Sequence, residues 1–300
     1  MRQQTRAYLY ACTTLLLWST VASAFKLTLD RISFDELLFF SSFFSLCILG
    51  VIVGSSSRLR AIASWPLSDY LQSAVLGFLN PFLYYLVLFK AYSLLPAQEA
   101  LTLNFIWPIV LVLFSILVLG QRISLRTLAA MLVSFSGVIV ISTRGDVLGF
   151  RVTNPLGAGL AVGSSVVWAL NWVYSSKDTR DAVSRLFLNF VFGFAFITLY
   201  MFVVPGAPTL DPRGLAGSLY VGAFEMGIAF VVWLKALRLS RTAAQVSNLI
   251  YLTPFLSLVV VHFAVGEEIF PSTVAGLVLI IGGILIQHYG RHLAARKSNR

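Results

Sequence analysis

The stretch Pro108–Ile123 reads PIVLVLFSILVLGQRI, and the stretch Pro254–Ile269 reads PFLSLVVVHFAVGEEI. In both stretches a glycine follows the proline 12 residues later, and the residues between them are mostly apolar. Runs of this length without alternation are untypical of barrel strands, so they indicate helices in a bilayer. The shared spacing also indicates that one structural unit occurs twice in the chain.

The composition of the whole chain agrees with a membrane protein. Of the 300 residues, 58% are hydrophobic and 11% are charged, and the mean hydropathy is +0.86. Soluble domains have about 25% charged residues and disordered chains have low hydrophobicity, so both classes are excluded. The net charge of +10 comes from bases in short gaps between apolar runs, which is typical of membrane orientation signals rather than of nucleic-acid binding. Cys12 and Cys47 lie inside apolar runs and predict neither a disulfide nor a metal site.

Ten apolar segments reach the length of about 20 residues that a membrane-spanning helix needs. They are Ala7–Leu27, Phe34–Val53, Tyr70–Leu94, Pro96–Leu119, Ser124–Ser142, Pro155–Ser176, Ser184–Val204, Arg213–Leu237, Thr242–Val265 and Pro271–Tyr289. The short loops between them leave no room for a soluble domain, so we predict an all-α membrane protein with ten transmembrane helices. The first segment also resembles a cleavable signal peptide, but its length and its place in the repeat favour a retained helix.

The distribution of lysine and arginine predicts the orientation in the membrane. If the N-terminus is cytoplasmic, 16 of these bases lie in cytoplasmic segments and 6 lie outside. This excess agrees with the rule that cytoplasmic loops are positively charged. We therefore expect both termini in the cytoplasm, which an even number of helices permits.

The two halves of the chain match beyond the quoted stretches. Lys90-Ala91 in the first half corresponds to Lys235-Ala236 in the second. We predict two repeats, residues 1–145 and 146–300, with five helices each. Because five is odd, the second repeat enters the membrane from the opposite side. The loop after the first quoted stretch is basic and the equivalent loop after the second is acidic, which agrees with a cytoplasmic and an external location. Inverted repeats around a midplane site are typical of transporters that open to each side in turn.

Polar side chains inside the predicted helices are candidates for substrate binding, because they are costly in hydrocarbon unless they face a cavity or a partner. Glu225, near the middle of the eighth helix, either holds a substrate ammonium or a proton, or is a protonated acid bonded to a neighbouring helix. Its counterpart Asn80 precedes Pro81, which either opens a carbonyl to a cavity or only kinks the helix. Glu99 is a second ammonium or proton candidate, although the helix dipole alone also favours an acid at a helix N-terminus. The remaining amide candidates are Gln245 and Asn248.

Aromatic residues deep in the predicted helices are candidates for a side-chain pocket. Trp168, Asn171 and Trp172 share one face of the sixth helix by their spacing. Tryptophan usually gathers at membrane interfaces, so deep tryptophans beside asparagine favour a cavity for a bulky, partly apolar ligand, with ordinary packing as the alternative. The other aromatic candidates are Trp18, Tyr84 and Trp107.

The sequence lacks the motifs of several other classes. It contains no Gly-x-x-x-x-Gly-Lys-Ser/Thr phosphate loop, no Gly-x-Ser-x-Gly and no His-Glu-x-x-His. We therefore expect no cofactor, no metal and no catalytic residues, and transport driven by a gradient or by facilitated diffusion. An intramembrane enzyme and a channel remain as remote alternatives.

The ten helices, the two inverted halves and the proline-to-glycine ending of each fourth helix resemble the drug/metabolite transporter superfamily, EamA type, over nearly the whole chain. The first half departs from the pattern, because Gln121 stands in place of the acid that the second half keeps as Glu267. Within the superfamily, the chain looks most similar to bacterial inner-membrane exporters of aromatic amino acids. The resemblance implies a central cavity lined by the first, third, fourth, sixth, eighth and ninth helices, and gating by rocking of helices around it.

The resulting prediction is a secondary transporter that exports amino acids, aromatic or large hydrophobic ones favoured, from the cytoplasm by alternating access. Export of other small metabolites or drug-like amines is the alternative. The expected partners are a small-molecule substrate and the lipid bilayer, without nucleic acid and with the number of copies left open. The expected location is the bacterial inner membrane.

Overall fold

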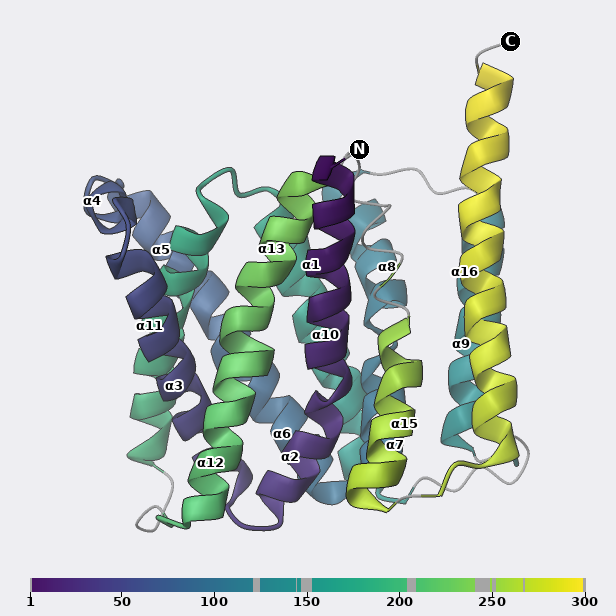
Figure 1. The fold of residues 1–300 in the computed structure, drawn as a ribbon, viewed down its shortest axis with the longest axis horizontal. Helices are drawn as coiled ribbons and strands as arrows, with labels where there is room; N and C mark the ends of the chain where they lie inside the picture. Colours follow the sequence, from purple (N-terminus) through teal and green to yellow (C-terminus); the bar gives the residue numbers. More distant parts are fainter. Residues whose placement is uncertain are drawn as a thin grey trace.

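The computed structural model describes residues 2–120, 125–143, 145–146, 153–203, 209–240, 249, 252–266 and 268–298. The regular structure within these residues is helical, without a strand (Figure 1). Seven helical segments of this described part are long and apolar enough to cross a membrane: Gln3–Leu29, Phe34–Gly54, Leu67–Leu94, Ala97–Val118, Pro155–Ser176, Ala182–Met201 and Pro212–Leu239. Shorter apolar helices cover Leu128–Ile141, Thr253–Val265 and Pro271–Gly283.

Most of these segments consist of more than one helical element. The first half contains α1 (Arg2–Ser19), α2 (Val21–Leu29), α3 (Phe34–Gly54), α4 (Arg58–Ala63), α5 (Leu67–Gly77), the π-helix η1 (Phe78–Leu83), α6 (Tyr84–Leu94), α7 (Ala97–Asn104), α8 (Trp107–Leu119) and α9 (Leu125–Ser142). The second half contains α10 (Pro155–Ser176), α11 (Ala182–Met201), α12 (Pro212–Val221), the π-helix η2 (Gly222–Gly227), α13 (Ile228–Leu239), α15 (Thr253–Val265) and α16 (Pro271–Ser298).

Side-chain caps determine where several helices begin. At the start of α3, Ser33 Oγ accepts a hydrogen bond from Glu36 N at 3.2 Å, and the Glu36 carboxylate accepts one from Ser33 N at 2.7 Å. Asn154 Oδ1 caps α10 by accepting a hydrogen bond from Gly157 N at 3.0 Å. These caps satisfy N–H groups that have no partner within their own helix.

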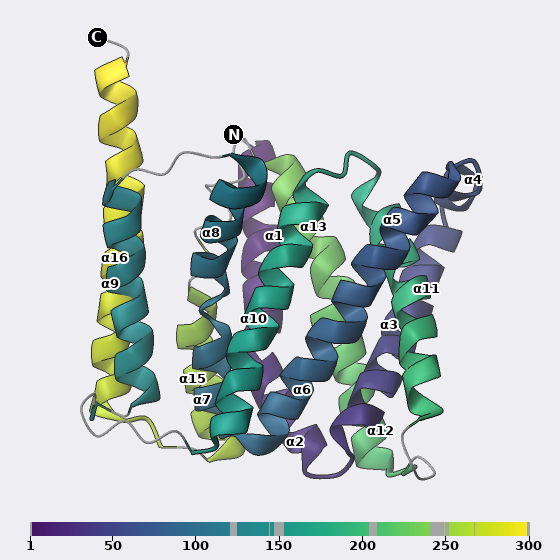
Figure 2. The ribbon, with the colours of Figure 1, turned by 180° about the vertical axis from the view of Figure 1, so that it is seen from behind.

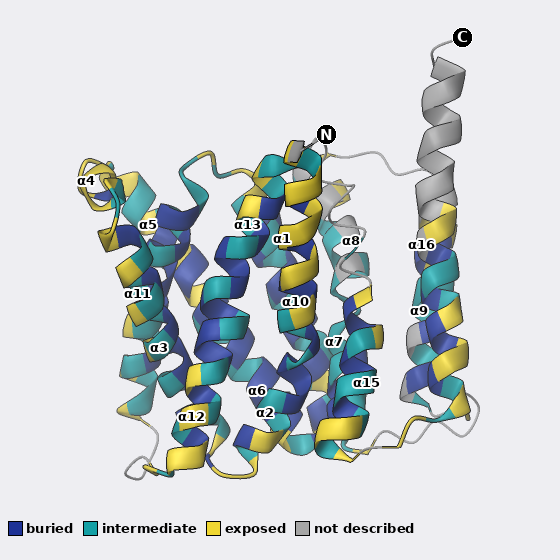
Figure 3. Ribbon diagram, viewed as in Figure 1, coloured by how far each residue is buried: buried dark blue, intermediate teal, exposed yellow. Residues whose placement is uncertain are grey.

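The distribution of buried residues agrees with a helical bundle surrounded by lipid. Buried residues lie toward the middle of the bundle, and exposed residues cover its outer faces (Figure 3). Tyr85 and Phe190 are among the fully buried side chains. On the outside, Val51 and Phe263 are 73% and 81% exposed. Large apolar side chains exposed in such number are stable against lipid tails, so the chain is a multi-pass membrane protein.

Helices of the two halves pack across each other in matching pairs. α1 packs against α13 as α10 packs against α6, and α3 packs against α12 and η2 as α11 packs against α5 and η1. α9 and α16 lie side by side at one edge of the bundle (Figures 1 and 2). Glycines at the junctions α5–η1 and α12–η2 allow close approach to the neighbouring helices α11 and α3. A Cβ at Gly77 would collide with Asn189 O of α11, and a Cβ at Gly222 would collide with Ser41 O of α3.

Equivalent helices of the two halves run in opposite directions. α1 begins at one end of the bundle, which we call the N-side, and leads away from it, whereas α10 leads toward it (Figures 1 and 2). Likewise α3 runs toward the N-side and α11 runs away from it.

Candidate substrate site

The third long helix of each half is interrupted in its middle. In the first half, η1 separates α5 from α6, and the backbone of Asn80 is non-helical (φ −152°, ψ 118°) directly before Pro81. Proline removes a backbone N–H and crowds the preceding turn, which accounts for this interruption. In the second half, η2 separates α12 from α13 and ends at Gly227 (φ −103°, ψ −88°), and it contains Glu225.

The fourth long helix of the first half is also interrupted. α7 ends at Asn104, and α8 begins at Trp107 after a turn at Phe105 and Ile106. Pro108 cannot donate the helical hydrogen bond to the Asn104 carbonyl, which explains the break. In the second half, α15 begins at Thr253 directly before Pro254, the residue that matches Pro108 in the repeat.

A cavity of about 110 Å³ lies among these interrupted helices. Its wall is mainly aromatic, and both halves of the chain contribute to it. The residues that line it are Trp18, Val21, Ala22, Phe25, Tyr84, Leu88, Tyr92, Leu101, Asn104, Phe105, Trp107, Trp168, Trp172, Glu225 and Thr253.

The aromatic rings of the wall pack on one another and form a connected surface. The rings of Tyr84 and Trp168 are stacked, with centroids 4.5 Å apart and an interplanar angle of 27°. Trp168 makes an edge contact with Trp172 at 5.9 Å, and both Trp18 and Trp168 contact Phe230, at 5.7 Å and 5.8 Å. Stacked and edge-on aromatic pairs add stability beyond area burial, so the wall is preorganised for a flat or bulky apolar group.

Glu225 is the one acidic or basic residue among the described residues that line the cavity. Its Oε1 accepts a hydrogen bond from Tyr85 Oη at 3.0 Å, and its backbone oxygen accepts one from Trp18 Nε1 at 3.5 Å. A carboxylate can accept about four hydrogen bonds, so the bond from Tyr85 leaves capacity for a cationic ligand. Asn104, from the first half of the chain, adds an amide to the cavity wall, and its Nδ2 donates a hydrogen bond to Ser164 Oγ at 2.8 Å.

Six of the residues predicted from the sequence line this cavity: Trp18, Tyr84, Trp107, Trp168, Trp172 and Glu225. Asn80 and Asn171 are buried, but they are not among the lining residues. Glu99 is also not among the lining residues. Its carboxylate accepts hydrogen bonds from Thr153 N at 3.4 Å and from Thr153 Oγ1 at 2.6 Å. Gln245 and Asn248 lie outside the described residues.

The sequence prediction omitted Asn104, Tyr92 and Thr253, which all line the cavity. Two of these had a usable signal, because Asn104 lies one turn before Trp107, and Tyr92 lies two turns after Tyr84. Thr253 had none, since a single hydroxyl residue in an apolar run is common in membrane helices.

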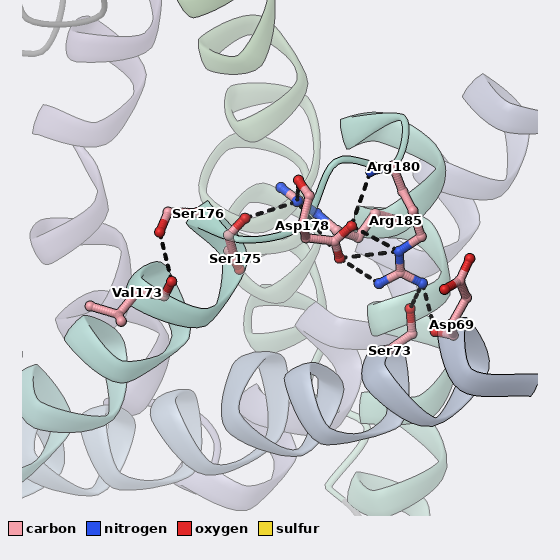
Figure 4. Close-up of polar contacts among 8 residues, drawn as sticks. All are labelled: Asp69, Ser73, Val173, Ser175, Ser176, Asp178, Arg180 and Arg185. Atoms are coloured by element: carbon pink, nitrogen blue, oxygen red, sulfur yellow. Dashed lines mark hydrogen bonds and ion pairs between the residues drawn. The ribbon is translucent and has the colours of Figure 1, made fainter. Parts of the chain in front are cut away.

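A separate polar network lies at the N-side, in the turn between α10 and α11 (Figure 4). Arg180 pairs with Asp178 at 2.5 Å and donates to Asp69 O at 2.6 Å and Ser73 Oγ at 3.0 Å. Arg185 donates to Ser175 O and Asp178 O, both at 3.0 Å. Burial alone raises the pKa of Asp178, but hydrogen bonds from Arg180 and the charge of Arg185 outweigh it and lower the pKa below the ordinary value. The network therefore joins the α10–α11 turn to α5.

Asp181 joins three further elements at the same end. Its Oδ1 caps α11 by accepting a hydrogen bond from Ser184 N at 3.0 Å, and its carboxylate pairs with Arg58 of α4 at 3.1 Å and with Arg238 of α13 at 2.7 Å. Burial raises the pKa of Asp181, but the hydrogen bonds from Ser184, Arg238 and Arg58 outweigh it and lower the pKa to about 2.

Comparison with known proteins identifies the family. The model of the EamA-like transporter family matches residues 5–143 and again residues 155–287. The aromatic amino acid exporter YddG of Ancylobacter novellus is 28% identical over 291 residues, which are 93% of this chain and 96% of the relative. The uncharacterized transporter YvbV of Bacillus subtilis is 28% identical over 233 residues, which are 76% of this chain and 73% of the relative.

A solved crystal structure that is 23% identical in sequence shares the fold, with a TM-score of 0.70 over 99% of each chain. The two family matches cover most of both halves, and they confirm the resemblance that the sequence predicts. The chain belongs to the EamA-like transporter family.

Proposed function

We propose that this protein is a secondary transporter that exports amino acids with aromatic or large hydrophobic side chains from the cytoplasm. The observation that carries the proposal is the cavity between the two halves, in which an aromatic wall surrounds one carboxylate. An aromatic wall favours a flat or bulky apolar group, and a carboxylate favours an ammonium group. The relatives named aromatic amino acid exporters support this substrate class.

The proposed architecture is ten transmembrane helices in two inverted repeats, residues 1–145 and 146–300. The seven long and three shorter apolar helices of the described part support the number of spans. The opposite directions of α1 and α10, and the matching π-helical interruptions η1 and η2, support the inversion. Two such units can exchange conformations and open the cavity to each side in turn.

The cavity residues have distinct proposed roles. Trp18, Trp107, Trp168 and Tyr84 shape the pocket for the side chain of the substrate, and Trp172 closes the aromatic wall. Glu225 binds the ammonium group or carries a proton. The sequence-based candidates for polar contacts in another conformation of the cycle are Asn80, Asn171, Gln245 and Asn248. Glu99 is a further candidate from the sequence, but its carboxylate is engaged with Thr153, so we assign it no role in binding.

The proposed location is the bacterial inner membrane, with both termini in the cytoplasm. The N-side of the bundle carries the turn between α10 and α11, with Lys177 and Arg180, and the first part of α11, with Arg185. Basic residues concentrate on the cytoplasmic side of membrane proteins, which supports this orientation.

Counterflow in proteoliposomes tests the function. Vesicles with the purified protein and an unlabelled amino acid inside should accumulate the radiolabelled amino acid from outside in a saturable way, whereas vesicles without protein should not. A pH difference across the vesicle membrane distinguishes proton coupling from facilitated diffusion. If no amino acid, nucleobase, sugar or drug-like amine exchanges, the transporter proposal is wrong.

Export of drug-like amines is the second candidate, and one observation favours it. Within the described part of the chain, the lining of the cavity contains an acid but no base. A cationic amine with an apolar body needs nothing more than this acid and the aromatic wall. Saturable exchange of such amines, with no exchange of amino acids, would favour the second candidate over the first.

A further inference from the structure

α15, which belongs to the ninth predicted helix, begins at the cavity. α15 begins at Thr253 and runs for 13 residues away from the N-side. The N–H groups of a first helical turn have no partner in their own helix, and the helix dipole places partial positive charge there. Thr253 lines the cavity, so the positive end of α15 lies at the cavity wall. Helix N-termini that point at a substrate site favour anionic groups.

The hydroxyl of Thr253 points independently to a ligand. Thr253 is only 7% exposed, and its Oγ1 has no hydrogen-bond partner among the described residues. A buried hydroxyl without a partner is unfavourable. Because Thr253 lines the cavity, a bound molecule can supply the missing partner.

The indole N–H of Trp172 is a second polar group of the cavity wall without a hydrogen-bond partner in the described part of the chain. Trp172 Nε1 is buried and has no hydrogen-bond partner in the described part of the structure, although Trp172 lines the cavity. Trp172 and Leu249, which lies one turn before Thr253, pack against the same cluster of Ala7, Ala11, Trp233 and Ala236. Trp172 and Thr253 thus both line the cavity, and each has a polar group without a partner in the described part of the chain. An indole N–H can only donate, so the ligand group that satisfies it is an acceptor.

The equivalent position in the first half has a different chemistry. Trp107 starts α8 before Pro108, as Thr253 starts α15 before Pro254. The first half thus presents an aromatic ring where the second half presents a hydroxyl. Lys26, which follows the lining residue Phe25, donates to Tyr92 O at 3.0 Å and to Leu95 O at 2.9 Å and is not among the lining residues.

We propose that Thr253 Oγ1, Trp172 Nε1 and the N-terminus of α15 form a subsite for the α-carboxylate of the substrate. This inference rests on the proposed function and assigns the substrate to the zwitterionic α-amino acids. Glu225 binds the ammonium group, the aromatic wall binds the side chain, and neutral donors with a helix dipole bind the carboxylate. A simple amine lacks the group that this subsite recognises.

Matched pairs of substrates test the subsite. In counterflow with proteoliposomes, the added competitors are three amino acids and their decarboxylated amines, namely those of tryptophan, tyrosine and phenylalanine. The readout is the apparent KM of each amino acid divided by the apparent KM of its amine. Thr253→Val removes the hydroxyl at nearly constant volume, and we expect the ratio to rise about tenfold, as for the loss of one hydrogen bond to a charged group. Thr253→Ser keeps the hydroxyl and should restore the wild-type ratio. Trp172→Phe should raise the ratio in the same direction.

Ser257 is the matched control. It is fully buried on the next turn of α15, its Oγ also lacks a partner among the described residues, and it does not line the cavity. Ser257→Ala should therefore leave the ratio of KM values unchanged.

The possible outcomes separate the two proposals. If the wild type exchanges amino acids but Thr253→Val and Trp172→Phe leave the ratio of KM values unchanged, the carboxylate subsite is wrong and the transport function stands. The same conclusion follows if Ser257→Ala raises the ratio as strongly as Thr253→Val. If the wild type exchanges neither amino acids nor amines, the proposed function is wrong, and the subsite falls with it.

Discussion

At the scale of single residues, Glu225 and Glu99 have opposite surroundings although both are acids in apolar helices. Glu225 lines the aromatic cavity and accepts one hydrogen bond from Tyr85, whereas Glu99 is engaged with Thr153 outside the cavity. We expect Glu225→Gln to lower counterflow of aromatic amino acids at least about tenfold, because an amide attracts an ammonium group much less than a carboxylate does. The pH dependence of exchange should disappear with the charge.

Glu99→Gln provides the comparison, since it also removes a carboxylate charge. Transport by this variant should stay within about twofold of wild type, because its position contributes no charge to the cavity. Initial rates of exchange between about pH 6 and pH 8 measure both variants. Equal loss in the two variants would contradict the assignment of Glu225 as the acid of the site.

Asp181 shows how a single charge contributes to stability at the N-side. Its folded pKa is about 2, below the ordinary value of 3.8, so its stabilisation is fully present above about pH 4 and is lost as the pH falls toward 2. Arg58 and Arg238 are 35% and 57% exposed, and water screens both pairs. We therefore expect Asp181→Asn to lower the free energy of unfolding by about 1 kcal/mol at neutral pH.

Asparagine keeps an oxygen that can cap α11, so the Asp181→Asn variant isolates the charge. Thermal unfolding of the detergent-solubilised protein measures the effect. The difference between wild type and variant should shrink between about pH 4 and pH 2. A difference that persists unchanged at the lower pH would contradict the electrostatic origin.

At the scale of helices, the contact between η2 and α3 depends on Gly222. A Cβ at this position would collide with Ser41 O and press on Phe44 and Ser45 N. Gly222→Ala should therefore destabilise the protein by about 1–3 kcal/mol and reduce transport, because η2 holds Glu225. Gly159→Ala is the control, since open space surrounds Gly159 within its helix and alanine favours helix there. In thermal unfolding, Gly222→Ala should have a lower Tm than the wild type, and Gly159→Ala should have a slightly higher one.

The helices were largely predictable from the sequence, but their interruptions were not. The predicted segments Phe34–Val53 and Pro155–Ser176 nearly coincide with α3 and α10, because long apolar runs bounded by Ser33 and Asn154 leave few alternatives. The π-helical turn η2 has no sequence signal apart from Gly222 and Gly227, because a period of 3.6 residues hides one added residue. The pattern indicated a kink at Pro81 but not a second one around Glu225.

The sequence predicts those residues of the candidate site whose type is unusual inside an apolar membrane helix. Deep tryptophans and a midplane acid are rare, so Trp18, Trp168 and Glu225 could be selected from the sequence. Thr253 could not, because its importance comes from the start of α15 at the cavity, which only the folded chain defines. For Glu99 the sequence left two interpretations open, and its place in the first turn of α7 agrees with the helix-end alternative.

At the scale of the whole molecule, the proposed inversion of the two halves makes a direct prediction about topology. The turn between α2 and α3 contains Arg31, and the equivalent turn between α10 and α11 contains Thr179. In a background with Cys12 and Cys47 replaced by alanine, a membrane-impermeant maleimide should label Arg31→Cys from the outside of intact cells. It should label Thr179→Cys only in inside-out vesicles. Labelling of both positions from the same side would contradict the inverted arrangement.

The pairing of α9 with α16 has a consequence for how the two halves stay joined. Gly137 and Gly276 bring these helices into backbone contact, and Ser134 Oγ donates to Ile280 O at 3.3 Å. No described residue of either helix lines the cavity. The pair therefore joins the two halves at a distance from the cavity, in addition to the pairs α1–α13 and α10–α6. A bulky replacement of Gly137 would then separate α9 from α16 at Gly276 and Ile280, while the lining of the cavity keeps its own contacts.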